Sequence, residues 1–339
     1  MRAEIFEQPA ALRATLGALL PRRGEIRRLA AGTRQVLLIA RGTSDNAAVY
    51  GLYLLQVQAG LLATLASPSI ATSYRSRLDL SGVLAVALSQ SGRTEEIVDT
   101  LAWAGECGAR TLAITNGPGS PLAAAADVAL VTEAGPERAV PATKTFTTQL
   151  AALAVLALGL GAPLDAGELQ AVPDEIDRML ADGLDLEPIV TELAGAAGVV
   201  VSGRGLAYSA ALELALKLKE ACYLHAMGLS YADLLHGPMA VVDAQTPAII
   251  VAADSGPVLA GTIDLAKRVR ATGARAYAIG GGPGLAEVSS RALPGPRLPE
   301  WLAPLGLIVP GQLLTEALAR RRGIDPDSPR GLSKITQTA

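Results

Sequence analysis

The feature of this sequence that most restricts its fold is an internal repeat of strand, turn and helix. Continuous apolar runs at residues 35–40 (QVLLIA) and 83–88 (VLAVAL) are each followed by a short polar turn and a helical pattern. The same succession returns at residues 198–202 (GVVVS) and 248–252 (AIIVA). Corresponding turns in the two copies are 163 or 164 residues apart. The repeat therefore predicts two copies of one α/β fold.

Helical crossovers between strands make each predicted sheet parallel. Aromatic residues make up only 3% of the chain, so the cores must consist of Ala, Leu, Val and Ile, which suits helices packed on a parallel sheet. Right-handed crossovers place the strand-to-helix turns at the carboxyl edge of the sheet, where such folds bind ligands. We expect five segments: an N-terminal helical segment (1–28), a first domain (29–170), a helical acidic linker (171–190), a second domain (191–316) and a C-terminal tail (317–339).

Composition excludes several classes of protein. The chain has 29 basic and 32 acidic residues and no long run of like charge, so we expect no nucleic-acid partner. The most apolar segment, 150–160, is too short to span a bilayer and is interpreted as a buried helix. Glu4 and Glu7 interrupt any signal peptide, and Cys107 and Cys222 cannot form a disulfide framework, which favours the cytoplasm. No metal and no cofactor are expected.

The turn after the second predicted strand is a candidate phosphate site. Ser89, Ser91 and Thr94 surround the point where a helix begins. Unpaired N–H groups and the positive end of the helix dipole attract anions there, and hydroxyls can donate further hydrogen bonds. These residues could equally just cap the helix. In the second copy Asp254 occupies the corresponding stretch and would repel a phosphate, so we expect one phosphate cradle per chain.

Residues 213–238 concentrate ionisable side chains in an otherwise apolar chain. Lys217 and Glu220 are three residues apart, so they share a helix face, either as an exposed salt bridge or as a functional pair. Glu213 can equally pair with Lys217. His236 precedes a Gly-Pro turn, so we place its imidazole on a loop.

Seven short strings, taken in order, resemble the sugar-isomerase (SIS) family, and within it the isomerase part of glucosamine-6-phosphate synthase. They are EIFEQP (4–9), ARGTS (40–44), SQSGRTEE (89–96), ATKTFTTQL (142–150), LKLKE (216–220), HGP (236–238) and PRGLSK (329–334). The resemblance implies two tandem flavodoxin-like αβα domains, in agreement with the repeat. It also implies a phosphorylated sugar or amino sugar as ligand.

The resemblance assigns roles to individual residues. Glu220 matches the carboxylate that moves a proton between C1 and C2 of the opened sugar, and Lys217 the lysine beside the developing oxyanion. His236 matches a ring-opening histidine that reaches the site of the neighbouring subunit, which implies a homodimer. Lys334, otherwise a solvated charge, matches a lysine that forms a Schiff base with the open ketose. The implied substrate-binding residues are Thr43, Ser44, Ser89, Gln90, Ser91, Thr94, Glu137, Val140, Ala142 and Ser333.

Two departures from the synthase shape the functional hypothesis. The sequence begins Met1-Arg2-Ala3 and contains no glutaminase segment with an N-terminal cysteine, and Ala142 stands where the synthase has a serine. The favoured hypothesis is deamination of glucosamine 6-phosphate, or a close analogue, to fructose 6-phosphate and ammonia. The alternatives are an aldose–ketose isomerase, a synthase-type isomerase subunit with a separate ammonia source, and a non-catalytic sugar-phosphate sensor.

Overall fold

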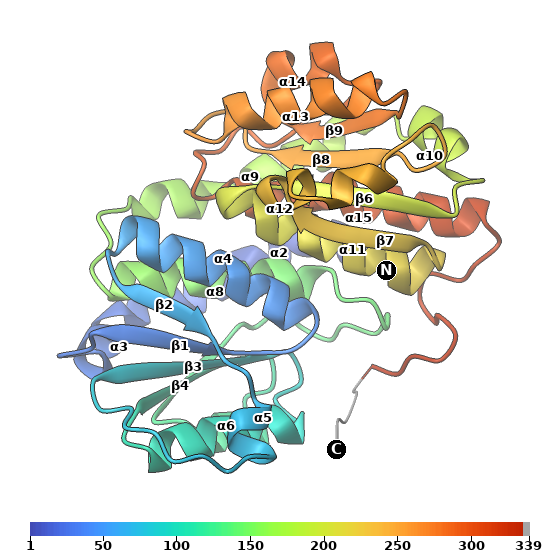
Figure 1. Ribbon diagram of the computed structural model, residues 1–339. Coiled ribbons are helices and arrows are strands. Elements are labelled where there is room, and N and C mark those ends of the chain that lie inside the picture. Colours follow the sequence, from blue (N-terminus) through green and yellow to red (C-terminus); the bar gives the residue numbers. More distant parts are fainter. Residues whose placement is uncertain (335–339) are drawn as a thin grey trace. The chain divides into compact units, whose positions relative to one another are not determined.

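Two parallel five-stranded sheets with helices on both faces make up the protein, as seen in the computed structural model, which describes residues 1–334 (Figure 1). Backbone contacts divide the chain into two compact units, each assembled from separate stretches of sequence. The C-terminal unit comprises Met1–Pro9, Arg138–Thr143 and Ala171–Leu332. The N-terminal unit comprises Ala10–Glu137, Lys144–Gln170, Ser333 and Lys334.

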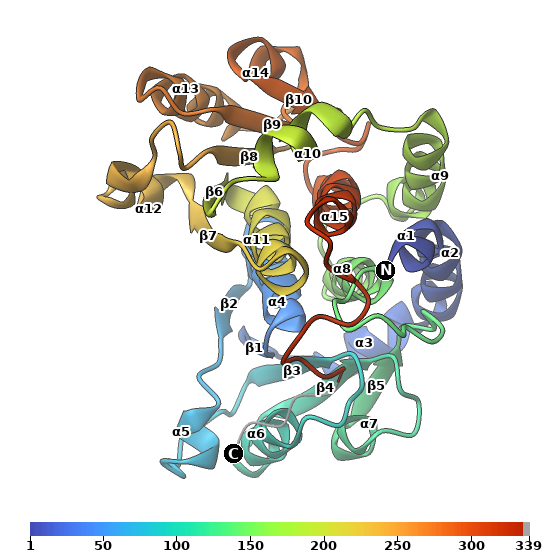
Figure 2. The same cartoon turned by 90° about the vertical axis from the view of Figure 1, so that its right-hand side faces the viewer.

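The sheet of the N-terminal unit has the order β2-β1-β3-β4-β5, with every neighbouring pair parallel. Helices α4 and α8 cover one face, and α6 and α7 cover the other (Figure 2). This order creates a topological switch point between β1 and β3, because the chain leaves these two neighbouring strands in opposite directions. The elements are β1 (Gln35–Ile39), α4 (Thr43–Gln58), β2 (Leu62–Leu65), β3 (Val83–Ser89), α6 (Glu95–Glu106), β4 (Arg110–Thr115), α7 (Pro121–Ala125), β5 (Val128–Val131) and α8 (Lys144–Gly159).

The sheet of the C-terminal unit, read from β7, has the equivalent order β7-β6-β8-β9-β10. Helices α11 and α15 pack on one face, and α12, α13 and α14 on the other (Figure 2). The elements are β6 (Gly198–Gly203), α11 (Tyr208–Cys222), β7 (His225–Ser230), α12 (Tyr231–Leu235), β8 (Ala248–Ala252), α13 (Leu259–Ala271), β9 (Ala276–Gly280), α14 (Gly282–Val288), β10 (Arg291–Leu293) and α15 (Ala303–Arg321). The shared strand order confirms the predicted pair of α/β domains with parallel sheets.

Burial follows from covering each sheet on both sides. All seven residues of β3 are buried, as expected for a central parallel strand between two helix layers. Every residue of α8 is buried as well, which confirms the buried helix expected at residues 150–160. No helix within residues 1–334 is both long enough and apolar enough to cross a bilayer.

The remaining elements are further helices and a tail. After α15, residues 322–334 form turns and bends without regular secondary structure. The helices not yet named are α1 (Arg2–Phe6), α2 (Gln8–Leu19), η1 (Leu20–Arg22), α3 (Arg23–Leu29), α5 (Ser69–Thr72), α9 (Ala166–Asp182), α10 (Glu187–Leu193), η2 (Gly205–Ala207) and η3 (Pro238–Val241).

Candidate active site

The loop after β3 contains the predicted phosphate cradle. The Ser89 hydroxyl accepts a hydrogen bond from the Gly92 N–H, and the Ser91 hydroxyl accepts one from the Arg93 N–H, both at 3.2 Å. Gly92 has a φ of 61°, and a Cβ there would lie 2.2 Å from the Ser120 hydroxyl oxygen, so the turn requires glycine. Neither serine hydroxyl donates to an acceptor within residues 1–334. Both O–H groups can therefore donate to an anion.

Capping does not explain the threonine of this loop. Thr94 is the N-cap residue of α6, yet its side chain makes no capping hydrogen bond. The Gln90 carbonyl oxygen accepts the Asn116 N–H at 3.0 Å, which fixes the loop against the end of β4. The backbone of the phosphate cradle is thus held between the carboxyl ends of β3 and β4. The side chains of Gln90 and Thr94 are half-buried.

The loop after β1 lies on the other side of the switch point. Thr43 and Ser44 begin α4, and the buried Ser44 hydroxyl accepts a hydrogen bond from the Gln149 side-chain amide of α8 at 2.9 Å. Arg41 forms a two-pronged ion pair with Glu96 in the first turn of α6, at 3.0 and 3.1 Å. This pair ties the two loops together at the position where open α/β sheets bind ligands.

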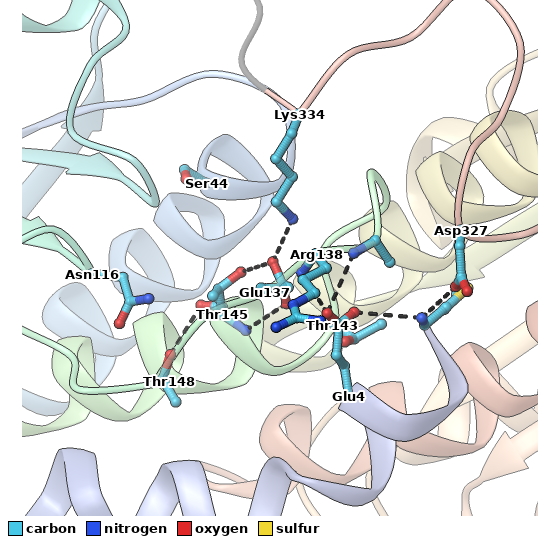
Figure 3. A network of polar contacts seen from close by, with 12 residues as sticks. Glu4, Ser44, Asn116, Glu137, Arg138, Thr143, Thr145, Thr148, Asp327 and Lys334 are labelled. Atoms are coloured by element: carbon cyan, nitrogen blue, oxygen red, sulfur yellow. Dashed lines mark hydrogen bonds and ion pairs between the residues drawn. The ribbon is translucent and has the colours of Figure 1, made fainter.

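Glu137 and Lys334 form a buried ion pair in the N-terminal unit. The Glu137 side chain is fully buried, and its Oε2 lies 2.8 Å from the Lys334 ammonium (Figure 3). The same carboxylate accepts the Thr145 N–H at 3.1 Å and the Thr145 hydroxyl at 2.6 Å. Lys334 is therefore not the solvated charge expected by default, because a lysine this close to a buried, hydrogen-bonded carboxylate is held in place.

A line of three charged side chains runs along α11 in the C-terminal unit. The Lys217 ammonium lies 3.3 Å from Glu213 Oε1 and 2.5 Å from Glu220 Oε2. Their spacing of four and three residues puts all three on one helix face. Glu213 and Lys217 are 0% and 1% exposed, whereas the Glu220 side chain is 23% exposed. The exposed salt bridge considered from the sequence is therefore wrong, and Glu220 is the member that can meet a ligand.

The charge state of Lys217 follows from these neighbours. Burial by itself would lower the pKa of Lys217, but the carboxylates of Glu213 and Glu220 outweigh it and raise the pKa above its ordinary value. Lys217 is consequently an ammonium at neutral pH. It can stabilise negative charge or donate a proton, and it leaves the role of base to a carboxylate.

The other predicted site residues are placed as follows. His236 is the exposed C-cap residue of α12, as the predicted loop position requires. Val140 and Ala142 are half-buried in a segment of the C-terminal unit, where the Val140 N–H donates to the Asp327 carbonyl at 3.0 Å. Ser333 is exposed and directly precedes Lys334.

The corresponding loops of the C-terminal unit have different polar side chains. After β8, the Asp254 carboxylate accepts the N–H of Gly282, which follows β9, at 3.0 Å. A side-chain carboxylate here takes a backbone donor of the kind that a bound anion would use. The loops of the N-terminal unit contain serine hydroxyls in the equivalent region.

Sequence reasoning left two buried partners out of the site. Glu213 was weighed only as an ion-pair partner, although its burial makes it the permanent counterion of Lys217. Gln149 lies within a quoted motif, but only the folded chain shows its amide against the Ser44 hydroxyl. A polar residue directly before the apolar stretch 150–159 of α8 was the signal available for Gln149.

Comparison with known proteins agrees with this architecture. The family described as SIS domain matches residues 31–159 and 192–285. The glutamine–fructose-6-phosphate aminotransferase (isomerizing) of Symbiobacterium thermophilum is 38% identical over 362 residues, which cover 98% of this chain and 58% of that protein. The chain thus spans less than three fifths of the length of the curated relatives it matches.

Two solved structures show the same fold along nearly the whole chain. The C-terminal domain of glucosamine-fructose-6-phosphate aminotransferase from Francisella tularensis has 30% identity and a TM-score of 0.84, covering 96% of this chain and 97% of that one. Glucosamine-6-phosphate deaminase from Thermotoga maritima has 24% identity and a TM-score of 0.80, covering 99% of both chains, and this likeness shows the fold alone. The chain belongs to the SIS family.

Proposed function

We propose that the chain converts glucosamine 6-phosphate, or a close analogue, to fructose 6-phosphate with release of ammonia. The observation that carries this proposal is the line of Glu213, Lys217 and Glu220 on α11. It combines a partly exposed carboxylate with a buried ammonium whose charge is fixed by a second carboxylate. Proton transfer between adjacent carbons beside a carbonyl requires such a base next to a cation.

Glu220 acts as the base in the proposed reaction. In the open-chain amino sugar it removes the proton from C2, and the electron pair of that C–H bond forms the C1=C2 bond of an enolamine. The electron pair of the C1 carbonyl moves to O1, which takes a proton from water. Returning the first proton to C1 gives an iminium group at C2, so Glu220 ends the step as it began. Lys217 stabilises the negative charge that develops on the neighbouring oxygen, and Glu213 keeps Lys217 protonated while Glu220 holds the proton.

Release of ammonia is assigned to Lys334. Its nitrogen attacks C2 of the iminium group, ammonia leaves, and the resulting lysine imine is hydrolysed by water to the ketose and the free amine. The attacking amine must first lose a proton, and the Glu137 carboxylate at 2.8 Å is placed to accept it. The nitrogen comes from the amino sugar itself, so no further donor enters the reaction.

The phosphate group is assigned to the cradle after β3. Ser89, Ser91 and Thr94 offer hydroxyl donors at the start of α6, where the helix dipole favours an anion. Gln90 of the same loop, together with Thr43 and Ser44 of the loop after β1, would contact the same ligand. Binding this remote group supplies energy that orients C1 and C2 toward the reacting side chains.

His236 is assigned to ring opening in a homodimer. Its imidazole is exposed at the end of α12 rather than enclosed by its own chain. An exposed imidazole can donate a proton to a ring oxygen in a site completed by a second subunit. Val140, Ala142 and Ser333 are proposed to line the sugar pocket, with Ala142 affecting which sugar is accepted.

The test is to incubate the purified chain with glucosamine 6-phosphate and to measure fructose 6-phosphate and ammonia separately. We expect both products in equal amounts. Interconversion of glucose 6-phosphate and fructose 6-phosphate without ammonia would instead make the chain an aldose–ketose isomerase. Sugar-phosphate binding with no turnover of either substrate at any pH from 6 to 9 would leave only a sensor.

A further inference from the structure

The later part of the tail beyond α15 contacts the C-terminal unit at Asp327 and at Arg330. At the first, the Asp327 carboxylate pairs with the Met1 ammonium, and the Asp327 carbonyl accepts the Val140 N–H at 3.0 Å. At the second, the Arg330 N–H donates to the Tyr223 hydroxyl oxygen at 2.6 Å. Because residues 322–334 have no regular secondary structure, such side-chain contacts determine the path of the tail.

The Tyr223 side chain contacts both the backbone and the side chain of Arg330. Besides the hydrogen bond to the phenol oxygen, the Arg330 guanidinium lies 4.4 Å from the centre of the Tyr223 ring. That distance is within the range of a cation–π contact. One aromatic ring therefore fixes both the position and the orientation of Arg330.

The backbone of Tyr223 has an unusual, left-handed conformation. Tyr223 is the C-cap residue of α11, with φ 53° and ψ 34°, and its N–H closes the helix on the Leu218 carbonyl. Glycine is the usual residue in this left-handed conformation, because a Cβ makes it strained. A tyrosine that bears this strain while its side chain holds another segment indicates a role beyond ending the helix.

We propose that Tyr223 is a positioning residue that acts on Lys334 through Arg330. Lys334 follows Arg330 by four residues, and Glu220 precedes Tyr223 by three. The helix that presents the proposed base thus also fixes the chain just ahead of the proposed imine-forming lysine. This inference rests on the proposed function, because it concerns how often Lys334 meets the ketose.

Chain length sets the size of the expected effect. Four residues reach at most roughly 14 Å, so the Tyr223 anchor confines Lys334 closely. Lys334 is also held by its ion pair with Glu137, which opens when the lysine nitrogen attacks C2. Without the Tyr223 contacts, the preceding hydrogen bond of the tail to the C-terminal unit is at Asp327, seven residues before Lys334, and once the ion pair is open a chain of that length lowers the effective concentration of the lysine about twofold. Loss of orientation adds to this dilution. We expect imine formation at Lys334 to slow by about 3- to 10-fold.

Three variants separate the contacts. Tyr223→Gly removes ring and hydroxyl but retains a residue suited to the left-handed conformation, so α11 keeps its end. Tyr223→Phe removes only the acceptor for the Arg330 N–H, and Arg330→Ala removes only the stacked guanidinium. Tyr74→Phe is the control for loss of a phenol, since Tyr74 is 78% exposed in the N-terminal unit.

The first measurement is hydrogen–deuterium exchange of residues 325–334 and requires no substrate. We expect the Arg330 amide to exchange at least about tenfold faster in Tyr223→Gly and Tyr223→Phe than in the parent or in Tyr74→Phe. The thermal midpoint of Tyr223→Gly should not fall, whereas a tyrosine needed only for stability would lower it. Should Tyr223→Gly fail to fold, the Tyr223→Phe result decides.

The second measurement traps the imine that Lys334 forms with fructose 6-phosphate. The lysine nitrogen bonds to C2 as water leaves, and borohydride supplies hydride to C2, giving a secondary amine that mass spectrometry locates. We expect the trapping rate in Tyr223→Gly to fall 3- to 10-fold. Equal amide exchange or equal trapping in parent and variant overturns the inference. Absence of trapping in the parent chain overturns the proposed function instead, a different and separately visible result.

Discussion

The two units share one strand order but differ at the loops where that order places a ligand. In the N-terminal unit the loop after β3 presents Ser89 and Ser91, whose hydroxyls accept hydrogen bonds from N–H groups of their own loop. In the C-terminal unit the loop after β8 contains Asp254, which already occupies the Gly282 N–H. The ionisable groups of that unit lie instead on α11, as the line of Glu213, Lys217 and Glu220.

This difference shows that the duplicated fold forms a crevice at the same place in both units, and that the side chains in each crevice determine whether it can bind an anion. A parallel sheet offers the same crevice at its carboxyl edge in both copies. A carboxylate in one crevice disfavours an anion there, whereas hydroxyls in the other favour it. Binding and chemistry can therefore be separated by mutation, and the following predictions do so.

The largest effect should come from Glu220→Gln. An amide cannot take the proton from C2, so we expect kcat to fall by about 10²- to 10⁴-fold while the dissociation constant of the sugar phosphate stays within about twofold. Turnover assays and calorimetric titration measure the two quantities on the same sample. Unchanged turnover would reduce Glu220 to a structural partner of Lys217.

The second prediction concerns the stability of the C-terminal unit. Lys217→Met leaves Glu213 buried without its counterion, so the free energy of unfolding should fall by about 3 to 5 kcal/mol in urea titrations. The double variant Lys217→Met with Glu213→Leu should recover most of this loss, because no fully buried charge is left unpaired and Glu220 is partly exposed. A double variant as unstable as the single one would contradict this account.

The contribution of the Lys217 ion pair should also be visible in the pH dependence of stability. The pKa of Lys217 in the folded chain is raised above its ordinary value of 10.5. Its contribution is therefore complete below pH 10.5 and is lost as the pH rises through the higher folded-state value. Thermal midpoints recorded between pH 7 and pH 12 should decline at the alkaline end more steeply in the parent than in the double variant.

A smaller effect is expected at the phosphate cradle. Ser91→Ala removes one hydroxyl donor to a charged ligand, which is worth about 1.5 to 3 kcal/mol, so sugar-phosphate affinity should fall about 10- to 100-fold. Because the phosphate is remote from C1 and C2, part of the loss should appear in KM. Titration with inorganic phosphate checks that the loss belongs to the phosphate group.

The smallest effect should come from Asp254→Ala. Sugar-phosphate affinity should change less than about twofold, because this loop does not bind the phosphate in our scheme. The Gly282 N–H loses its acceptor, which should lower the free energy of unfolding by about 1 kcal/mol. A loss of affinity equal to that of Ser91→Ala would show that both crevices bind the ligand, contrary to the difference between the two units described above.

Several features were predictable because they depend on local pattern. The strands and their repeat followed from apolar runs and turn residues, and the shared helix face of Lys217 and Glu220 followed from their spacing. The pairing of Lys334 with Glu137 was not, because 197 residues separate them and no local rule connects a tail to a buried loop. The homodimer, the cytoplasmic location and the roles of His236 and Ser333 stay predictions.

The sequence by itself determined the α/β class, the duplication and the residue types available at each sheet edge, since strand and helix periodicity are properties of neighbouring residues. Only the tertiary structure decided which charges are buried and which are shared. Glu213 became a counterion, Lys334 became an ion-pair partner and Tyr223 became an anchor through contacts with their surroundings in the folded chain. Desolvation and long-range contact exist only once the chain is packed, and that is where these roles arise.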